Sequence, residues 1–562
     1  MLGPRGASMA FDFLHTWERN AARVAEVAGV LVRYGLADWL KDVPLPPLRR
    51  RLRSFEGDRI PDLPAGARLR LALTELGTTF IKLGQMLSTR PDLVGHEVAE
   101  ELTQLQSGTP PAPPEVVREL IAKELGAPPE RIFLEFEAAA FAAASIAQVH
   151  RARVVSGRRV VVKVMRPGTE EQVARDLEIL AWLADLAEKH APALRPYQPA
   201  ATARQFSRTL RRELDFRHER QHLAVFAAGF AGDDTVRFPA PFPEHCTRRV
   251  LTMEELEGVA GADAEGLRAA GADLREFARR GALMYLRMIF RDGFYHADPH
   301  PGNLMLLPGA VVGVLDCGMI GRLDEQLRGD FEAMLLAAAD RDAASLADIV
   351  LRLGQVPPDC HEDELRADLD ELVGDFVGVT LTDFDVGGAL RALVDIIRRH
   401  HILLPPSLSL LLKVLVMLEG TSRRLDRDFS LAELMQPFYA EAVKRRLAPT
   451  TLARRARRSV REWERLLGAL PRDLGDVLSR VRRGEINVRL EHHRLDRTIN
   501  RVIAGLLTAS LVLASSFLWA MKAPPTYRGV SIVGVLGYLT AAWLGWRTLR
   551  AIHQSGDLRN RD

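Results

Sequence analysis

Apolar positions follow their most regular pattern around TELGTTFIKLGQMLSTRPDL, a segment that begins at Thr74. Apolar residues there recur at alternating steps of three and four, at Leu73, Leu76, Phe80, Leu83 and Leu87. This spacing predicts a helix with one buried face. Lys82 and Gln85 fall together on its polar face. Proline-rich breaks at DVPLPPL and TPPAPPE divide the surrounding helical patterns, so residues 1–130 are expected to form a helical extension.

Strand patterns begin after residue 130. The stretch FEAAAFAAASIAQVHRARVVSGRRVVVKVMRPG predicts a hairpin of two strands with an SGR turn, and RRVLTMEELEG predicts a further strand. Residues 131–257 are therefore expected to form a lobe that contains a sheet. Residues 258–445 are expected to form a mainly helical lobe, interrupted by the polar loop FYHADPHPGNLM and the apolar stretch VVGVLDCGM. The predicted fold class is α+β.

The C-terminal region, residues 501–550, contains two uncharged stretches, 502–521 and 529–546, of about the length that crosses a bilayer. Flanking basic residues predict a transmembrane helical hairpin with both ends in the cytoplasm; they are Arg489, Arg494, Arg497, Arg501, Arg547 and Arg550. The alternative is a buried helical pair in a soluble domain. A stripe of small residues suits close helix packing: Gly537, Ala541 and Gly545.

Charge and composition exclude some classes of protein. The 76 basic and 73 acidic residues nearly cancel, to a formal charge of +3, and aromatic residues make up only 6%, so nucleic acid is not an expected partner. The three cysteines lack CxxC spacing, which argues against a disulfide scaffold or a cysteine zinc site. The arginine-rich linker, residues 446–500, predicts either a solvated helix face or a surface helix that meets anionic lipid.

The polar loop and the apolar stretch that follows it carry the candidate chemistry. Asp298 and Asn303 are five positions apart, and Asp316 follows in VVGVLDCGM. Two carboxylates and an amide that converge near a strand end are suitable ligands for Mg²⁺. Their order and spacing match the kinase signature HxDxxxxN followed by DxG, and Lys163 in VVVKVM corresponds to the phosphate-contacting lysine of kinases.

Two features depart from the protein kinase pattern. The loop over the phosphates is AAASIAQVH, built on alanine, which takes positive φ only at a cost and so should make the loop stiffer. The acidic helix expected to pair with Lys163 lies about fifty residues on, in RRELDFRHER. Within that segment Asp215 and Glu219 share a predicted helical face while Glu213 points elsewhere, so the segment could serve two cationic partners.

Together these motifs resemble the UbiB/AarF family of atypical, protein-kinase-like proteins linked to ubiquinone biosynthesis. The residues that carry the resemblance are KLGQ, AAASIAQVH, VKV with Lys163, ELD with Glu219, HADPHPGN and DCG, over most of residues 70–320. The resemblance implies a two-lobed kinase-like fold with a helical N-terminal extension. It also implies ATP and Mg²⁺ as cofactors, an inner-membrane location in a bacterium, and a cytoplasmic kinase-like domain.

The resemblance also implies roles for individual residues. Asp298 would be the catalytic-loop aspartate, Asn303 and Asp316 the metal ligands, and Lys163 the phosphate-contacting lysine held by Glu219. The alanine loop would contact the nucleotide through Ala143, Ala144, Ser145 and Ala147. The extension helix would fold over the site, with Gln85 beside the nucleotide and Lys82 meeting Glu213 and Asp215. That arrangement would occlude a protein substrate.

Three functions are compared on this basis. The leading hypothesis is a membrane-anchored atypical kinase or ATPase that supports isoprenoid-quinone biosynthesis and acts on, or is stimulated by, a small or lipid-like molecule. The second is an ATP-binding scaffold or lipid-extraction factor for quinone-biosynthesis enzymes, in which turnover is dispensable. The third, an ordinary protein kinase, lacks the expected glycine-rich loop.

Simpler interpretations apply to other polar residues of these motifs. His296 and His300 flank Asp298 at a spacing that suits zinc only on a helix, and the prolines of HADPHPGN oppose a helix, so loop-stabilising hydrogen bonds are favoured. Ser145 lacks a G-x-S-x-G context and reads as a turn or phosphate-contacting hydroxyl rather than a nucleophile. Cys317 reads as a small apolar filler, because neighbouring carboxylates oppose a thiolate.

Overall fold

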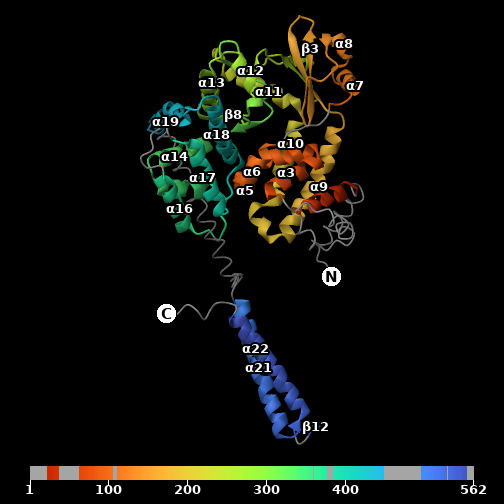
Figure 1. The fold of residues 1–562 in the computed structure, drawn as a ribbon, viewed down its shortest axis with the longest axis vertical. Coiled ribbons are helices and arrows are strands. Elements are labelled where there is room, and N and C mark those ends of the chain that lie inside the picture. The colour runs from red at the N-terminus through yellow and green to blue at the C-terminus, as the bar shows by residue number, and fades with distance from the viewer. Residues whose placement is uncertain are drawn as a thin grey trace, which may run out of the picture. The chain divides into compact units, whose positions relative to one another are not determined.

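The computed structural model describes residues 22–36, 63–105, 111–358, 360–375, 384–447, 495–527 and 530–553 (Figure 1). The chain divides into two compact units, Met1–Thr451 and Leu452–Asp562. Most of the strands and helices belong to the first unit.

A five-stranded antiparallel sheet forms the predicted sheet-containing lobe. Its strands are β1 (Phe133–Phe136), β2 (Ala142–Ala143), β3 (Ala147–Val154), β4 (Arg159–Met165) and β6 (Val250–Glu254), in the order β1-β3-β4-β6 with β2 beside β3. The predicted hairpin is confirmed as β3 and β4. On β4, Val160, Val162 and Val164 are fully buried and pack with residues of α7 (Pro114–Leu125). Because side chains alternate along a strand, Lys163 projects from the other face.

The helical extension confirms the amphipathic pattern read from the sequence. It contains a helix over residues 22–33, then α3 (Ala65–Leu76), α4 (Thr78–Leu87), α5 (Pro91–Val94) and α6 (His96–Thr103). Buried side chains of this extension, among them Leu73, Leu76 and Phe80, form one apolar cluster with residues of α9 (Thr169–His190). Two further helices, α10 (Pro199–Glu213) and α11 (Phe216–Gly229), follow in the chain.

The larger lobe is mainly helical, as predicted. Its helices are α12 (Ala264–Ala269), α13 (Leu274–Arg287), α14 (Glu325–Ala339), α15 (Ala343–Leu353), α16 (Glu362–Asp375), α17 (Val386–Arg399), α18 (Pro406–Leu425) and α19 (Leu431–Leu447). The polar loop lies between two short strands, β8 (Phe294–His296) and β9 (Leu304–Leu307). β8 pairs with β11 (Ile320–Arg322), and β9 pairs with β10 (Val311–Val314). β5 (Val236–Arg237) pairs with β10 and β7 (Val259–Ala260) pairs with β9, which gives a four-stranded sheet in the order β5-β10-β9-β7.

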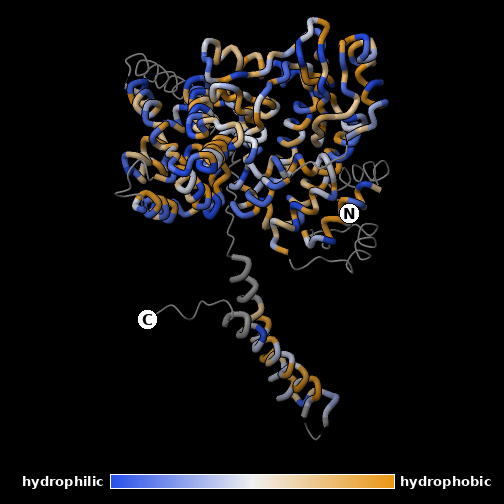
Figure 2. The backbone as a smooth tube through the Cα atoms, turned by 45° about the horizontal axis from the view of Figure 1, so that its top comes forward, coloured by the Kyte–Doolittle hydropathy of each residue, from blue (hydrophilic) through white to orange (hydrophobic). Residues whose placement is uncertain are grey.

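The second unit is a hairpin of α21 (Leu495–Ala520) and α22 (Ile532–His553), joined through β12 (Thr526–Tyr527) and β13 (Val530–Ser531). The predicted small-residue stripe lies between the helices, because a Cβ on Gly537 would meet the Ser515 side chain and Ala541 is buried. Apolar residues follow both helices (Figure 2).

The transmembrane part of the hairpin prediction is not supported. In the part of the chain that the structure describes, no helix meets the length and apolarity that crossing a bilayer requires. Most of the predicted basic linker, residues 448–494, lies outside the described residues.

Candidate functional site

Lys163 stands at the centre of the candidate site. Its Nζ donates to Glu219 Oε2 of α11 at 2.9 Å and to Asp316 Oδ2 at 3.2 Å. The side chains of Lys163 and Glu219 are 13% and 6% exposed, whereas that of Asp316 is half-exposed. Because a charge removed from water is costly unless it is paired, the two carboxylates fix the ammonium at this point. The predicted Lys163–Glu219 contact is therefore present.

The electrostatics of this triangle favour a charged Lys163 and Asp316. Burial alone would lower the pKa of Lys163, but the Asp316 and Glu219 carboxylates raise it above its ordinary value. Desolvation alone would raise the pKa of Asp316, but the Lys163 ammonium and the Gly318 N–H hold it well below its ordinary value. Burial raises the pKa of Glu219 to about 7, against the opposing effect of Lys163. Asp316 thus remains an anion across the physiological range.

The polar loop between β8 and β9 brings Asp298 and Asn303 together. Asn303 Nδ2 donates to Asp298 Oδ2 at 2.7 Å and to the Asp298 carbonyl oxygen at 3.2 Å. Prolines 299 and 301 keep the loop out of a regular helix, and only a short 3₁₀ turn, Pro301–Asn303, forms in it. The loop therefore holds the aspartate and the asparagine as one hydrogen-bonded pair.

The two histidines shape this loop, as the sequence favoured. The Asp298 N–H donates to His296 Nδ1 at 3.1 Å, and His296 Nε2 donates to the Asp316 carbonyl oxygen. The Gly302 N–H donates to His300 Nδ1 at 3.0 Å. His296 thereby links the polar loop to the backbone of Asp316. Among the described residues there is no cluster of three or more histidine, cysteine or acidic side chains that could hold a metal ion.

The donor set nevertheless suits Mg²⁺ bound together with phosphate. Mg²⁺ is usually held by one or two protein oxygen ligands, with water and substrate phosphates completing its octahedron. Asp316 supplies a carboxylate, and Asn303 turns its amide nitrogen to Asp298, which leaves its oxygen on the other side in this hydrogen-bonded assignment. These residues fit the ion only when a phosphate supplies further oxygens.

The alanine loop forms a tight strand connection. The Ala144 N–H donates to the Ala147 carbonyl oxygen at 2.8 Å, and β2 pairs with β3 through Ala142 and Ala143. No residue from 142 to 150, a stretch that is fully described, has a positive φ, so alanine meets no conformational penalty here. Ser145 and Ala147 are buried, and Ser145 is not presented as a nucleophile.

The extension helix α4 contacts this loop and the acidic segment. Thr78 Oγ donates to the Ser145 carbonyl oxygen at 3.2 Å, and Lys82 forms an ion pair with Glu213. Gln85 instead donates to the carbonyl oxygen of Leu105, within the extension, at 3.2 Å. A Cβ on Gly84 would collide with the Leu105 and Leu73 side chains, so the glycine of KLGQ permits close packing. The helix thus lies against the alanine loop at one end and α10 along its polar face.

Asp215 does not make the contact with Lys82 that the resemblance implied. The ELD segment is not one helix: α10 ends at Glu213, and Asp215 takes extended dihedral angles as the N-cap of α11. Its carboxylate accepts the Arg217 N–H at 3.1 Å and pairs with the Arg217 guanidinium. Aspartate is a preferred N-cap because its oxygen satisfies an unpaired N–H at the helix start. This break separates Glu213 from Glu219 and sends each to a different lysine.

The sequence missed Lys413, which belongs to the same site. This lysine of α18 donates from Nζ to Ser88 Oγ, just after α4, at 3.1 Å. Burial lowers its pKa to about 8, and the charge of Asp298 opposes the shift. The only local signal was one lysine inside the apolar run LSLLLKVLVML.

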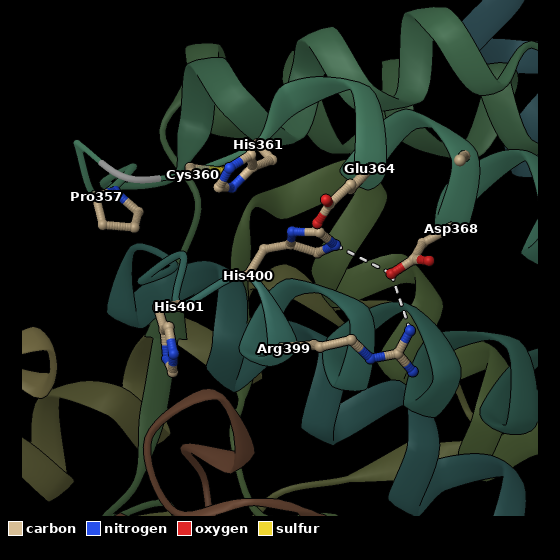
Figure 3. A pocket seen from close by; sticks show the side chains of 9 residues that line it. Pro357, Cys360, His361, Glu364, Asp368, Arg399, His400 and His401 are labelled. Atoms are coloured by element: carbon tan, nitrogen blue, oxygen red, sulfur yellow. Dashed lines mark hydrogen bonds and ion pairs between the residues drawn. The ribbon is translucent and has the colours of Figure 1, made fainter. Parts of the chain in front are cut away.

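A separate pocket lies at α16 and α17 and contains none of the predicted site residues (Figure 3). Asp368 accepts from Arg399 at 2.9 Å and from His400 Nε2 at 3.0 Å, which neutralises the charges on one wall. His361 and Glu364 of the neighbouring wall face the same space (Figure 3). The candidate site described above therefore does not include this pocket.

The chain matches three family models. Residues 104–350 match the family model described as the ABC1 atypical kinase-like domain, residues 369–430 the UbiB helical domain, and residues 489–554 the ABC1/UbiB kinase-like C-terminal domain. A solved structure, titled the complex structure of Rv3197-erythromycin from Mycobacterium tuberculosis, is 23% identical with a TM-score of 0.44. It covers 66% of this chain and 95% of its own.

Curated relatives match over most of their length. A protein named "Probable protein kinase UbiB" from Pseudomonas paraeruginosa is 34% identical over 81% of this chain and 87% of its own. Its namesake from Vibrio campbellii is 31% identical over 94% of this chain and 98% of its own. The chain therefore belongs to the ABC1/UbiB family of atypical kinase-like proteins.

Proposed function

We propose that this protein is an atypical kinase or ATPase that uses ATP and Mg²⁺ in support of ubiquinone or another isoprenoid-quinone biosynthesis. The observation that carries the proposal is the Lys163–Glu219–Asp316 triangle beside the Asp298–Asn303 pair. A cation held between two carboxylates, one of them at a metal-ligand position, is the arrangement that orients nucleotide phosphates in kinases. The names of the curated relatives support the pathway.

Each residue has one task in this proposal. Lys163 binds the nucleotide phosphates, and Glu219 holds its ammonium in place. Asn303 and Asp316 would hold Mg²⁺, which neutralises phosphate charge and so favours transfer. Asp298, oriented by the Asn303 amide, accepts the proton of an acceptor hydroxyl or water.

A small or lipid-like acceptor fits the site better than a protein side chain. The extension helix α4 lies over the acidic segment through Lys82 and Glu213 and contacts the alanine loop through Thr78. A peptide acceptor needs an open groove, whereas a phenolic or isoprenoid molecule needs only a narrow path.

Mg²⁺-dependent ATP turnover of the full chain, with and without detergent or a phenolic isoprenoid analogue, tests the enzymatic proposal. Asp298→Asn and Asp316→Asn keep the side-chain shape and remove the charge, so each should lower kcat by about 100-fold or more. Turnover equal to wild type in both variants would refute an enzymatic role.

The scaffold hypothesis differs in what it requires of Asp298. A nucleotide-gated scaffold or lipid-extraction factor needs Lys163 and Asp316 for binding but no proton acceptor. Asp298→Asn would then still restore quinone production in a deletion strain, whereas the enzymatic proposal expects no restoration. Quinone profiling of that strain separates the two functions.

We also propose that the hairpin of α21 and α22 places the protein at the bacterial inner membrane, with the kinase-like unit in the cytoplasm. Large apolar side chains are exposed on both helices, among them Leu513, Phe517, Leu539 and Trp543. Exposed apolar area of this kind marks an interaction surface. A reporter fused after Asp562 should be cytoplasmic in a membrane fraction; an external signal, or a wholly soluble fusion, would contradict the proposal.

A further inference from the structure

Lys413 is a cation in an apolar setting. The adjacent residues of α18, Leu411, Leu412, Val414 and Leu415, are all buried, yet the lysine extends from between them to Ser88. A lysine is seldom kept in such a helix position without a partner, because ordering and desolvating its ammonium both cost free energy. A lysine at this position is therefore expected to bind a polar or charged group, which the apolar core does not supply.

The contacts of the ammonium do not compensate this cost. In the part of the chain that the structure describes, no carboxylate forms an ion pair with Lys413, and its hydrogen-bond acceptor is the neutral Ser88 hydroxyl. α18 contacts the strand that precedes the polar loop, since the Tyr295 hydroxyl of β8 donates to the Ser407 carbonyl oxygen of α18 at 3.2 Å. The charge that acts on Lys413 is that of Asp298, in the loop after β8. Lys163 differs, because it meets two carboxylates directly. Lys413 is therefore a cation of this site whose ammonium can still bind an anion.

We propose that the Lys413 ammonium binds the terminal phosphoryl group of the nucleotide, beside Asp298, during transfer or hydrolysis. The inference rests on the proposed function and adds to it a residue that none of the recognised motifs contains. Positively charged side chains that clamp a transferring phosphoryl group stabilise the charge that develops on its oxygens. In this proposal Lys163, on the sheet, contacts the nucleotide phosphates, and Lys413, on α18, contacts the terminal phosphate.

The chemical step balances with these groups. The bond between the terminal phosphorus and the bridging oxygen breaks, and ADP leaves with that electron pair. A bond forms from the acceptor oxygen to phosphorus, and Asp298 takes the proton of the acceptor. Lys413 stays protonated throughout and contributes charge alone.

Three variants of the full chain separate this role from an anchoring role. Lys413→Met removes the charge at similar length and should lower kcat by about 100-fold. Lys413→Arg keeps the charge and should recover most of the rate. Ser88→Ala removes the hydrogen bond at the end of α4 but leaves the ammonium, so turnover should be nearly unchanged. If Ser88→Ala loses as much as Lys413→Met, the lysine only anchors the extension and the proposal is overturned.

Nucleotide binding provides a test that does not depend on turnover. Lys413→Met should weaken the Mg²⁺ complex of a non-hydrolysable ATP analogue by about tenfold and leave MgADP binding unchanged. Equal loss for both nucleotides, or no loss for either, contradicts contact with the terminal phosphate. If the wild type binds the analogue in a way that depends on Lys413 but shows no ATP turnover, only the enzymatic function is refuted. A wild-type protein that binds neither nucleotide would refute both proposals.

The pH profile gives a third readout that a structural role would not move. Because the pKa of Lys413 is lowered to about 8, kcat/KM of the wild type should fall as pH rises through that value. Arginine does not lose its proton in this range, so Lys413→Arg should move the fall to higher pH. A fall at the same pH in both proteins would contradict a charged Lys413 in the reaction.

Discussion

Two lysine–glutamate ion pairs take their carboxylates from the consecutive helices α10 and α11, and they differ in burial. Lys163 and Glu219 are 13% and 6% exposed, whereas Lys82 and Glu213 are 20% and 28% exposed. The first pair holds Lys163 inside the candidate site, and the second attaches the extension helix α4 to α10. The N-cap at Asp215 makes the division possible, because it separates the two helices that carry the glutamates. Because the inner pair is the more buried, we expect it to be the more rigid of the two and the outer pair to open more readily.

Removal of Glu219 should have the largest effect on stability. Glu219→Ala leaves a buried ammonium with only Asp316 as its partner, and breaking a buried pair costs about 3–5 kcal/mol. The matched change in the outer pair, Glu213→Ala, should cost about 0–1 kcal/mol. Urea denaturation of the full chain measures both. Equal losses would show that burial does not distinguish the two pairs.

The pH dependence of the inner pair should be the next largest effect. The pKa of Glu219 is raised from an ordinary value near 4.5 to about 7 in the folded state. Between these values the folded state binds more protons than the unfolded state, so this group's contribution to stability falls as pH rises from 4.5 to 7. Glu219→Gln should remove that slope from thermal unfolding curves. A wild-type slope that persists in the variant would assign it to other groups.

Loss of the N-cap between the helices should have a smaller effect. Asp215→Ala removes the oxygen that accepts the Arg217 N–H and should cost about 1 kcal/mol. Asparagine caps helices about as well as aspartate, so Asp215→Asn serves as the control and should lose little. The same denaturation experiment compares the two. An equal loss in both variants would indicate that the charge of Asp215, not the cap, stabilises this break.

The outer pair should give the smallest effect on stability but a visible one on mobility. Lys82 and Glu213 are partly exposed, so salt should screen their attraction more strongly than that of the inner pair. High salt, or Lys82→Met, should increase hydrogen exchange over Thr78–Leu87 while β4 remains protected. Unchanged exchange in α4 would mean that apolar packing alone holds the extension in place.

The sequence predicted the parts of the site that depend on residues close together in the chain. The strand pattern of RVVVKVM placed Lys163 on a sheet, and the spacing of Asp298 and Asn303 put both in one polar loop, where the structure joins them by a hydrogen bond. Lys413 could not be found this way, because Ser88 lies 325 residues away and an apolar helix gives no sign of what its one lysine contacts. The pairing of Lys82 with Glu213 came from the family resemblance, since only folding brings the extension to α10.

The acidic segment shows where a periodic pattern misleads. RRELDFRHER has helical spacing throughout, yet Asp215 prefers to cap a helix rather than continue one, and two helices meet there. A single helix would have joined Asp215 and Glu219 on one face. The break instead gives each ion pair a helix of its own.

The most direct test of the account is MgATP affinity in three full-length proteins: wild type, Lys163→Met and Lys82→Met. Both substitutions remove a lysine that forms an ion pair with glutamate, but only Lys163 also contacts Asp316. We expect calorimetry to detect MgATP binding to the wild type and to Lys82→Met, and little or none to Lys163→Met. Equal affinity in Lys163→Met and wild type would contradict a nucleotide site built on Lys163, Glu219 and Asp316.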